Sequence, residues 1–271
     1  MTVETTLFGT VKLQRCEDDS VYVCHIESLS NALKAEIRAK LVSICRGLAK
    51  ADKQLPANSY DRTLKEFLRR YNSKTDDTKK GMIAELLTHV LIRHLVANFS
   101  PVSPFFNMEE SSIKKAFDIV FHCSNTMEIW LTEVKSGHKS KNTAKEKNNS
   151  LLHLAKRSIV SQINGGDFHI WDNAINGALI SIRESSVRDE IENILSNCFV
   201  MAQDGLIDSK NFNIILTSVL YGGSNDKIDI SDVEEVKVGI ECERIFKGLI
   251  VFSIQKETYE AVEQFLRSEA A

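Results

Sequence analysis

An acid and a base lie two residues apart in Glu133-Val134-Lys135, which directly follows the apolar residues Ile129-Trp130-Leu131. We expect residues 115–122 and 127–135 to form two strands that are joined by a turn at Asn125-Thr126. Side chains at positions i and i+2 of a strand project from the same face, so both charged groups can reach one site. The sequence therefore predicts an acid and a base on one face of a β-hairpin.

The partner strand adds a second carboxylate. A two-residue turn at Asn125-Thr126 pairs Asp118 with Glu133, with Cβ atoms about 5 Å apart. Asp118 also lies inside the apolar run Phe117-Asp118-Ile119-Val120-Phe121, where a carboxylate is costly unless it is paired or coordinated. A divalent cation such as Mg²⁺ relieves the repulsion between two carboxylates, and the ammonium of Lys135 can orient a water and stabilise charge on a phosphate. These groups suit metal-assisted hydrolysis of a phosphodiester.

The spacing of this triplet is not specific by itself. Acid-x-Lys triplets also occur as Asp77-Thr78-Lys79, Asp208-Ser209-Lys210 and Glu235-Val236-Lys237. The first two lie in polar segments that we expect to be loops. The third is expected on the solvent face of a half-buried strand, because Val236, Val238 and Ile240 alternate with charged residues. The apolar surroundings of Glu133 distinguish its triplet from the other three.

Glu85 is a candidate third acid. It lies in Gly81-Met82-Ile83-Ala84-Glu85-Leu86-Leu87, within a helix that we expect over about residues 78–97. One interpretation places Glu85 on a narrow exposed stripe, or in a pair with Lys79, Lys80 or His89. The other makes it an additional metal ligand beside the two strand carboxylates.

The segment after the hairpin is basic. From Lys135 to Arg157 there are seven basic residues and one acid, Glu146, and a helix is expected over about 150–163. Such a run is either a solvated loop or a contact surface for backbone phosphates, which carry no sequence information. The second interpretation predicts DNA binding by Lys139, Lys141, Lys145, Lys147, Lys156 and Arg157, with Gln162 on the following helix.

The overall composition alone argues against a nucleic-acid partner. The 271 residues carry 34 basic and 37 acidic side chains, a net charge of −3, so the basic run is a local departure from a weakly acidic chain. The chain lacks a run of roughly 18 apolar residues that could span a membrane. Met1 to Thr10 do not resemble a secretory signal, and the six scattered cysteines form no CxxC pair. These features predict a cytoplasmic protein without a disulfide framework.

The remaining patterns predict an α/β fold, a mixed β-sheet flanked by helices. A hairpin is expected over 8–15 and 20–26. The polar stretch 72–80 suggests a boundary between an N-terminal α/β extension, residues 1–75, that packs on a core, residues 76–271. The other expected helices cover 30–49, 59–71, 186–202 and 256–268, and the other expected strands cover 177–182, 211–221 and 246–254.

The order of Glu85 on a helix, Asp118 on a strand and Glu133-Val134-Lys135 on the next strand resembles the core of the PD-(D/E)xK nucleases, which have a restriction-endonuclease-like fold. Phe117 stands where that family often has a proline. More narrowly, the chain resembles the HamA family, nuclease subunits of the Hachiman anti-phage defence system. The shared segments, which cover about 55 residues, are Lys80-Gly81-x3-Glu85-Leu86, Phe117-Asp118 and Glu133-Val134-Lys135-Ser136-Gly137.

The resemblance implies that Asp118 and Glu133 bind Mg²⁺ or Mn²⁺, that Lys135 assists the attacking water and that Glu85 completes the site. Gln162 resembles a helical glutamine of some members of the superfamily. The resemblance further implies a DNA nuclease that works with HamB, an ATP-dependent helicase, and the present chain carries no GxxxxGK[ST] motif of its own. A stand-alone restriction-type endonuclease and a non-catalytic adaptor on a nuclease-like fold are the alternatives.

Overall fold

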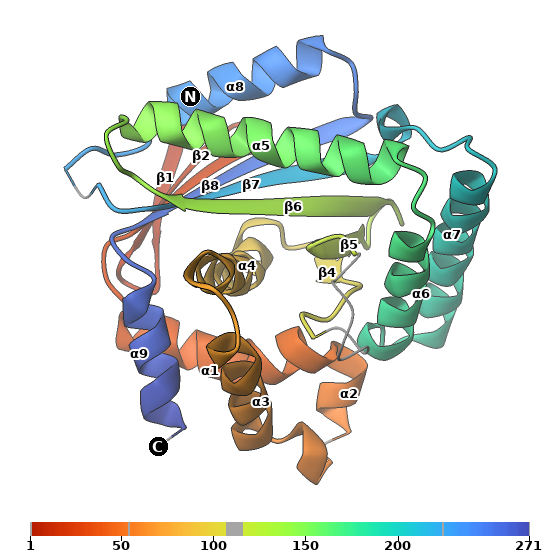
Figure 1. The fold of residues 1–271 in the computed structure, drawn as a ribbon, viewed down its shortest axis with the longest axis horizontal. Helices are drawn as coiled ribbons and strands as arrows, with labels where there is room; N and C mark the ends of the chain where they lie inside the picture. Colours follow the sequence, from red (N-terminus) through yellow and green to blue (C-terminus); the bar gives the residue numbers. More distant parts are fainter. Residues whose placement is uncertain (1, 54, 107–115, 224, 271) are drawn as a thin grey trace.

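A single β-sheet forms the centre of the molecule. The computed structural model describes residues 2–53, 55–106, 116–223 and 225–270 (Figure 1). The sheet has eight strands in the order β1-β2-β3-β8-β7-β6-β5-β4. Strands β3, β8, β7 and β6 run parallel, and the strands outside them pair antiparallel. The strands are β1 Thr2–Leu7, β2 Val11–Cys16, β3 Val21–Ile26, β4 Phe99–Pro101, β5 Ile119–Cys123, β6 Ile129–His138, β7 Asn213–Tyr221 and β8 Gly248–Lys256.

Helices cover both faces of the sheet, as predicted for a mixed α/β fold. One layer consists of α1 Asn31–Arg46, α3 Tyr60–Asn72, α4 Asp76–Leu95 and α9 Glu260–Glu269. The other face carries α5 Ala144–Asn164 and α8 Ile230–Cys242, and α6 His169–Ser181 and α7 Ser185–Gln203 lie together beside β4 and β5 (Figure 1). Three short elements complete the described chain: α2 Leu48–Asp52, η1 Pro56–Asn58 and η2 Ser209–Asn211.

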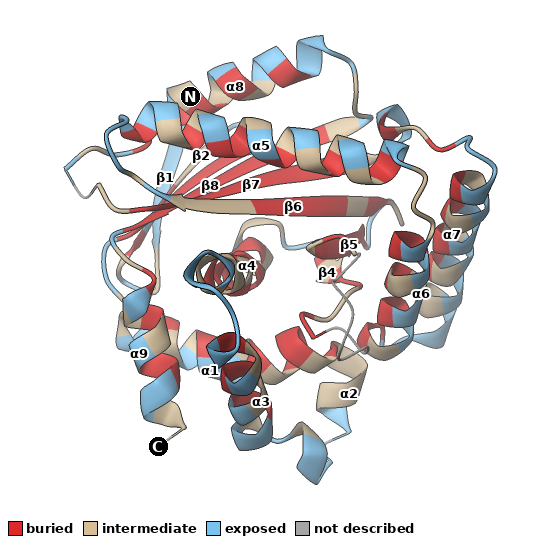
Figure 2. Cartoon of the chain, in the orientation of Figure 1, coloured by how far each residue is buried: buried red, intermediate tan, exposed pale blue. Residues whose placement is uncertain are grey.

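The alternation of side chains along β6 divides the core into two layers. Val134 packs in the cluster shared with α1, α3, α4 and α9, and Leu131 packs in the cluster shared with α5 to α8. The central strands are buried between these layers (Figure 2). Since residues i and i+2 share a face, Glu133 and Lys135 point to the same side as Leu131, which is the side of α5.

The N-terminal residues form part of the same sheet and core. The predicted hairpin is present as β2 and β3, and β3 pairs in parallel with β8 near the other end of the chain. Helices α1 and α3 share one buried cluster with α4. The boundary near residue 75 stays a sequence-based prediction.

Two predicted strands are helices, and both errors have the same physical cause. Residues 177–182 were expected to be extended, but α6 reaches Ser181 and buries Ile170, Ala174 and Ala178 at helical spacing. The segment around Glu235 is helix α8, in which Val233, Val236 and Ile240 form the buried stripe. Over a short apolar run, an alternating pattern and a helical pattern overlap, and the packing partners decide between them.

The basic segment is also more helical than predicted. Helix α5 begins at Ala144 instead of about residue 150, because Thr143 and Glu146 form a capping box at its start. Strands β1 and β4 had no predicted counterpart. Helix α4 ends at Leu95, before the two prolines at 101 and 104 that were expected to end it.

Candidate active site

Strands β5 and β6 have the predicted register. Ile119 pairs with Thr132 and His122 with Ile129, which is the pairing that sets Asp118 across from Glu133. The turn is longer than the predicted two residues, because the amide of Met127 donates to the carbonyl of Cys123 (2.8 Å) and Met127 adopts a positive φ of 55°. The longer loop leaves the register unchanged.

Asp118 lies directly before β5 and reaches across to β6. Its Oδ2 accepts a hydrogen bond from the backbone amide of Val134 at 2.8 Å, which fixes the carboxylate beside the neighbouring Glu133. Among the described residues, the ladder between β5 and β6 ends at the pair Ile119–Thr132, while β6 continues to His138. Asp118 and Glu133 therefore meet where the edge of β6 is no longer covered by β5.

Glu133 is the most buried acid of this group, with a relative exposure of 1%. Its Oε1 accepts from Lys135 Nζ (2.5 Å) and from Ser158 Oγ (2.7 Å), and its Oε2 accepts from Gln162 Nε2 (3.1 Å). Burial raises the pKa of Glu133, the charge of Asp118 raises it further, and Lys135 and Ser158 oppose this shift. The site thus holds a carboxyl group that any added cation would stabilise in its charged form.

Lys135 lies among acids from three elements. Burial lowers its pKa, but the charge and hydrogen bond of Glu133, together with the charges of Asp118 and Glu85, raise the pKa above the ordinary value of a lysine. The contribution of Glu85 shows that α4 brings this acid within electrostatic range of the strand residues. The structure therefore brings Asp118, Glu133 and Lys135 together at β6, and Glu85 contributes to the site through its charge.

Ser158 was not identified from the sequence, although it makes one of the short contacts of Glu133. It lies one helical turn before Gln162, so both side chains project from the same face of α5 toward β6. The i, i+4 spacing of these two polar residues is the signal that would have revealed the pair. It is weak in the sequence, because polar pairs at this spacing are common on exposed helix faces.

The carboxylates of Asp118 and Glu133 form a pair of ligands that suits a magnesium ion. Nowhere in the described ranges do three or more His, Cys, Asp or Glu side chains gather closely enough to hold a metal ion. Mg²⁺ is, however, usually bound by one or two carboxylates, with waters and substrate phosphates as the other ligands. Asp118 and Glu133 supply that minimum, and Glu85 lies in the same electrostatic environment.

A comparison with known protein families identifies the family of this chain. The family model described as HamA matches residues 7–264, almost the full length of the chain. The chain belongs to the HamA family. No curated protein matches the chain. No helix in the described parts of this HamA chain is long and apolar enough to cross a membrane.

Acids that are distant in sequence neutralise three of the six basic residues of this HamA chain that were predicted to bind DNA. Lys139 pairs with Asp226 (2.5 Å), Lys145 with Asp232 (2.8 Å) and Glu235 (3.2 Å), and Lys156 with Glu243 (2.6 Å). Asp232, Glu235 and Glu243 lie in or directly after α8, which packs beside α5, and Asp226 lies in the loop before α8. Lys141 and Arg157 are exposed and Lys147 is half-buried. The local positive charge of the sequence is therefore much smaller on the folded surface, and DNA binding by these residues stays a prediction.

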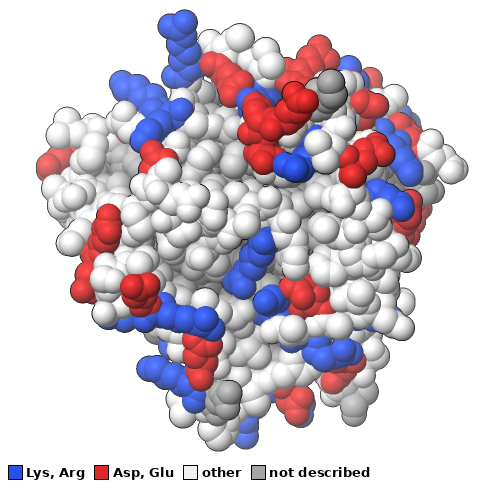
Figure 3. Space-filling view, turned by 180° about the vertical axis from the view of Figure 1, so that it is seen from behind, with Lys and Arg blue, Asp and Glu red and all other residues white. Residues whose placement is uncertain are grey.

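Acidic and basic side chains also lie next to each other on the side opposite to the view of Figure 1 (Figure 3). This distribution agrees with the net charge of −3. Electrostatic attraction of a polyanion by this chain must therefore depend on local clusters rather than on the surface as a whole.

Proposed function

We propose that this HamA-family chain is the metal-dependent DNA nuclease subunit of the Hachiman anti-phage defence system, with a site of the PD-(D/E)xK type. The observation that carries the proposal is the buried carboxylate of Glu133, which accepts from Lys135 and feels the charge of Asp118, where β6 extends beyond its pairing with β5. Membership of the HamA family supports the defence role. The chemistry of the site supports phosphodiester hydrolysis.

The chain's own residues can prepare this reaction. The amide of Val134 fixes Asp118, and the side chains of Ser158 and Gln162 orient Glu133. A bound Mg²⁺ or Mn²⁺ would supply a Lewis acid that polarises the phosphate and acidifies a water. Asp118 and Glu133 would hold that cation, and Glu85 is the candidate third ligand.

Lys135 is the residue that we propose to contact the phosphate group of the substrate. Its ammonium has three donors, so it can keep its hydrogen bond to Glu133 while it donates to an attacking water or to a phosphate oxygen. The raised pKa keeps Lys135 charged at neutral pH, which suits stabilisation of developing negative charge. General-base action by Lys135 is disfavoured by the same shift until its acidic neighbours are themselves neutralised.

The proposal includes DNA as substrate and an ATP-dependent helicase of the HamB type as partner, in the cytoplasm of a bacterium. Family membership supports a component of a multi-protein defence system. The sequence lacks a phosphate-binding GxxxxGK[ST] loop, so ATP-driven DNA unwinding would have to come from another chain. Purification of the chain from its host, followed by identification of the proteins bound to it, tests the partner.

Plasmid cleavage tests the activity. We expect the purified chain, alone or with its helicase, to convert supercoiled plasmid to nicked or linear forms in Mg²⁺ or Mn²⁺ and to stop in EDTA. Discrete fragments produced without any helicase would favour the stand-alone restriction endonuclease. DNA or helicase binding without cleavage under all metal conditions would favour the non-catalytic adaptor and would contradict the nuclease.

A further inference from the structure

The face of β6 that carries Glu133 and Lys135 continues to a glycine. Gly137 lies two residues after Lys135, so it faces α5 on the same side of the sheet. The side chain of Lys147, from the first turn of α5, extends over this glycine. A Cβ atom at residue 137 would lie only 2.9 Å from the Cε atom and 3.3 Å from the Nζ atom of Lys147. The missing side chain of Gly137 therefore leaves the room that the amine of Lys147 occupies beside the candidate active site.

Hydrogen bonds in the interior fix the start of α5 against the sheet. Asn148, the residue after Lys147, is fully buried. Its Nδ2 donates to Ser253 Oγ (3.1 Å), and its Oδ1 accepts from Ser218 Oγ (2.6 Å). Ser218 lies beside Lys135 in the ladder between β6 and β7. The backbone of Lys147 is thus anchored close to the level of Lys135.

The charge of Lys147 is not paired with an acid within the described part of the chain. No ion pair or hydrogen bond of its amine is found there. Lys139, Lys145 and Lys156 of the same basic segment, in contrast, each meet an acid. The side chain of Lys147 is half-buried, so its stem is covered while its ammonium group keeps three donors for a ligand.

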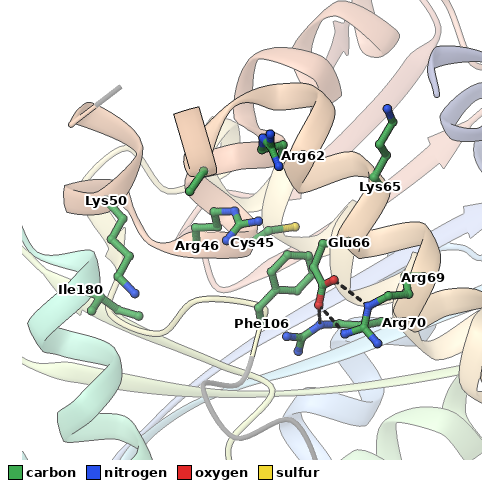
Figure 4. A pocket seen from close by; sticks show the side chains of 11 residues that line it. Cys45, Arg46, Lys50, Arg62, Lys65, Glu66, Arg69, Arg70, Phe106 and Ile180 are labelled. Carbon is green, nitrogen blue, oxygen red and sulfur yellow. Dashed lines mark hydrogen bonds and ion pairs between the residues drawn. The ribbon is translucent and has the colours of Figure 1, made fainter. Parts of the chain in front are cut away.

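A cavity among α1, α2 and α3 shows how the fold engages other cations (Figure 4). Glu66 accepts from Arg69 (2.8 Å) and from Arg70 (2.6 Å), and the guanidinium of Arg70 lies 4.5 Å from the ring centre of Phe106. The hydrogen bonds of the two arginines lower the pKa of Glu66 to about 2. These arginines are held by an acid and a ring of the chain itself. Lys147 is held in place without an acid, which suits a group that binds an anionic ligand.

The two lysines point to different places along β6. Lys135 leans toward Glu133, to which it donates a hydrogen bond of 2.5 Å, and Lys147 lies over Gly137. Two residues of a strand span about 7 Å, so the two ammonium groups suit neighbouring phosphates better than a single one. A lysine contacts a phosphate as a point charge and reads no base.

We propose that Lys147 binds a backbone phosphate next to the phosphodiester that the active site cleaves, and that Gly137 positions its amine for this contact. The inference rests on the proposed nuclease function. It assigns Lys147 a direct contact with the substrate, whereas Gly137 acts only through the space that it leaves.

Fluorescence anisotropy of a labelled DNA duplex in EDTA, over a series of salt concentrations, measures binding without cleavage. We expect Lys147→Ala to weaken binding about fivefold and to reduce the slope of log affinity against log salt by about one, because one phosphate contact is lost. Lys147→Arg keeps the charge and should retain most of the affinity. Gly137→Ala keeps every charge but places a methyl group where the amine lies, so it should weaken binding about threefold.

Lys210→Ala and Gly239→Ala are the matched controls. Lys210 lies before β7, at the opposite end of the sheet from Gly137, and pairs with Asp208 (2.8 Å). A methyl group added at Gly239 meets nothing within 4 Å. Both variants should bind DNA within about twofold of the wild type. Circular dichroism and melting curves check folding, and Gly137→Ala should fold because it displaces only the flexible end of a lysine and its φ is not positive.

Cleavage kinetics separate this contact from the chemical step. Lys147→Ala should raise the DNA concentration for half-maximal cleavage about fivefold and keep the maximal rate within about threefold, whereas Glu133→Gln should lose cleavage and still bind DNA. Absence of DNA binding by the wild type, an unchanged salt slope in Lys147→Ala, or an equal loss in Lys210→Ala would overturn the proposal. DNA binding that depends on Lys147, without cleavage in any metal, would support the phosphate contact and contradict the nuclease function.

Discussion

The same three residue types occur in two places with opposite outcomes. Glu133-Val134-Lys135 lies in β6, and Glu235-Val236-Lys237 lies in α8. In the strand, the two charged side chains share a face, and Lys135 Nζ contacts Glu133 at 2.5 Å. In the helix, residues two apart point in different directions, so Lys237 pairs with Glu241 at 2.7 Å and Glu235 pairs with Lys145. The acid and base of the motif therefore act on one site only in the extended backbone.

The carboxylates of Glu133 and Glu235 also differ in their exposure to solvent. Glu133 is 1% exposed and is surrounded by Asp118, Ser158 and Gln162, whereas the side chain of Glu235 is 73% exposed. Charges interact strongly only where water is excluded, so the pair in β6 can perturb its neighbours and orient a substrate. The pair in α8 contributes to a surface network whose net effect on stability is small. Matched substitutions in the two triplets measure this difference directly.

Loss of the acid should give the largest effect. We expect Glu133→Gln to reduce metal-dependent plasmid cleavage at least about a thousandfold, since it removes a proposed metal ligand, while Glu235→Gln stays within about twofold of the wild type. Initial rates of supercoiled-plasmid loss in Mg²⁺ measure both variants. Similar activities of the two variants would contradict the assignment of Glu133 to the active site.

Loss of the base should be the next largest effect. We expect Lys135→Ala to reduce cleavage about a hundredfold, because the positive charge beside the phosphate disappears, whereas Lys237→Ala loses only a surface ion pair. Single-turnover rates at saturating Mg²⁺ distinguish this loss from weaker metal binding. Full activity of Lys135→Ala would contradict the proposed contact between Lys135 and the phosphate.

The helix residues that orient Glu133 should have a smaller effect. We expect Ser158→Ala and Gln162→Ala each to increase the Mg²⁺ concentration for half-maximal cleavage about tenfold, as is typical when a group that positions a metal ligand is removed. Ser161→Ala is the control, because this serine is exposed on the same helix. An unchanged Mg²⁺ dependence in both variants would show that the contacts of α5 with Glu133 are only structural.

The pH dependence of stability should show the smallest effect. The pKa of Glu133 is raised above its ordinary value of 4.5, so the folded chain holds this proton at a pH where the unfolded chain has lost it. In EDTA, the wild type should therefore lose stability relative to Glu133→Gln as pH rises above 4.5 and through the raised pKa. Urea unfolding of both proteins across this range measures the difference.

The matched control for this pH series is Glu235→Gln, which makes the same substitution at an exposed acid of the second Glu-Val-Lys triplet. Addition of Mg²⁺ should stabilise the wild type more than Glu133→Gln, because a bound cation favours the charged carboxylate. A pH-independent difference between the wild type and Glu133→Gln would contradict the desolvation of Glu133.

Local patterns predicted a large part of the candidate site. The register of β5 and β6 followed from apolar runs on both sides of a short turn, because a two-residue repeat fixes which side chains share a face. The position of Asp118 across from Glu133 followed from that register even though the turn is longer than expected. An error in a loop changes little when both strands are bound by their own buried faces.

Interactions between distant segments were not predictable in the same way. Ser158 reaches Glu133 only because α5 packs across β6, and the lysines of the basic run lose their charge excess only because α8 packs beside α5. None of these segments by itself contains a sequence pattern that would predict these contacts.

The sequence by itself determined the layered α/β fold, the pairing of β5 with β6 and the position of Asp118 across from Glu133, because these depend on apolar periodicity over a few neighbouring residues. Only the tertiary structure decided that Glu235-Val236-Lys237 is helical, which helix supplies Ser158, and which lysines of the basic run meet an acid. Burial and the pairing of charges depend on what lies across the fold, and neighbours along the chain do not contain that information.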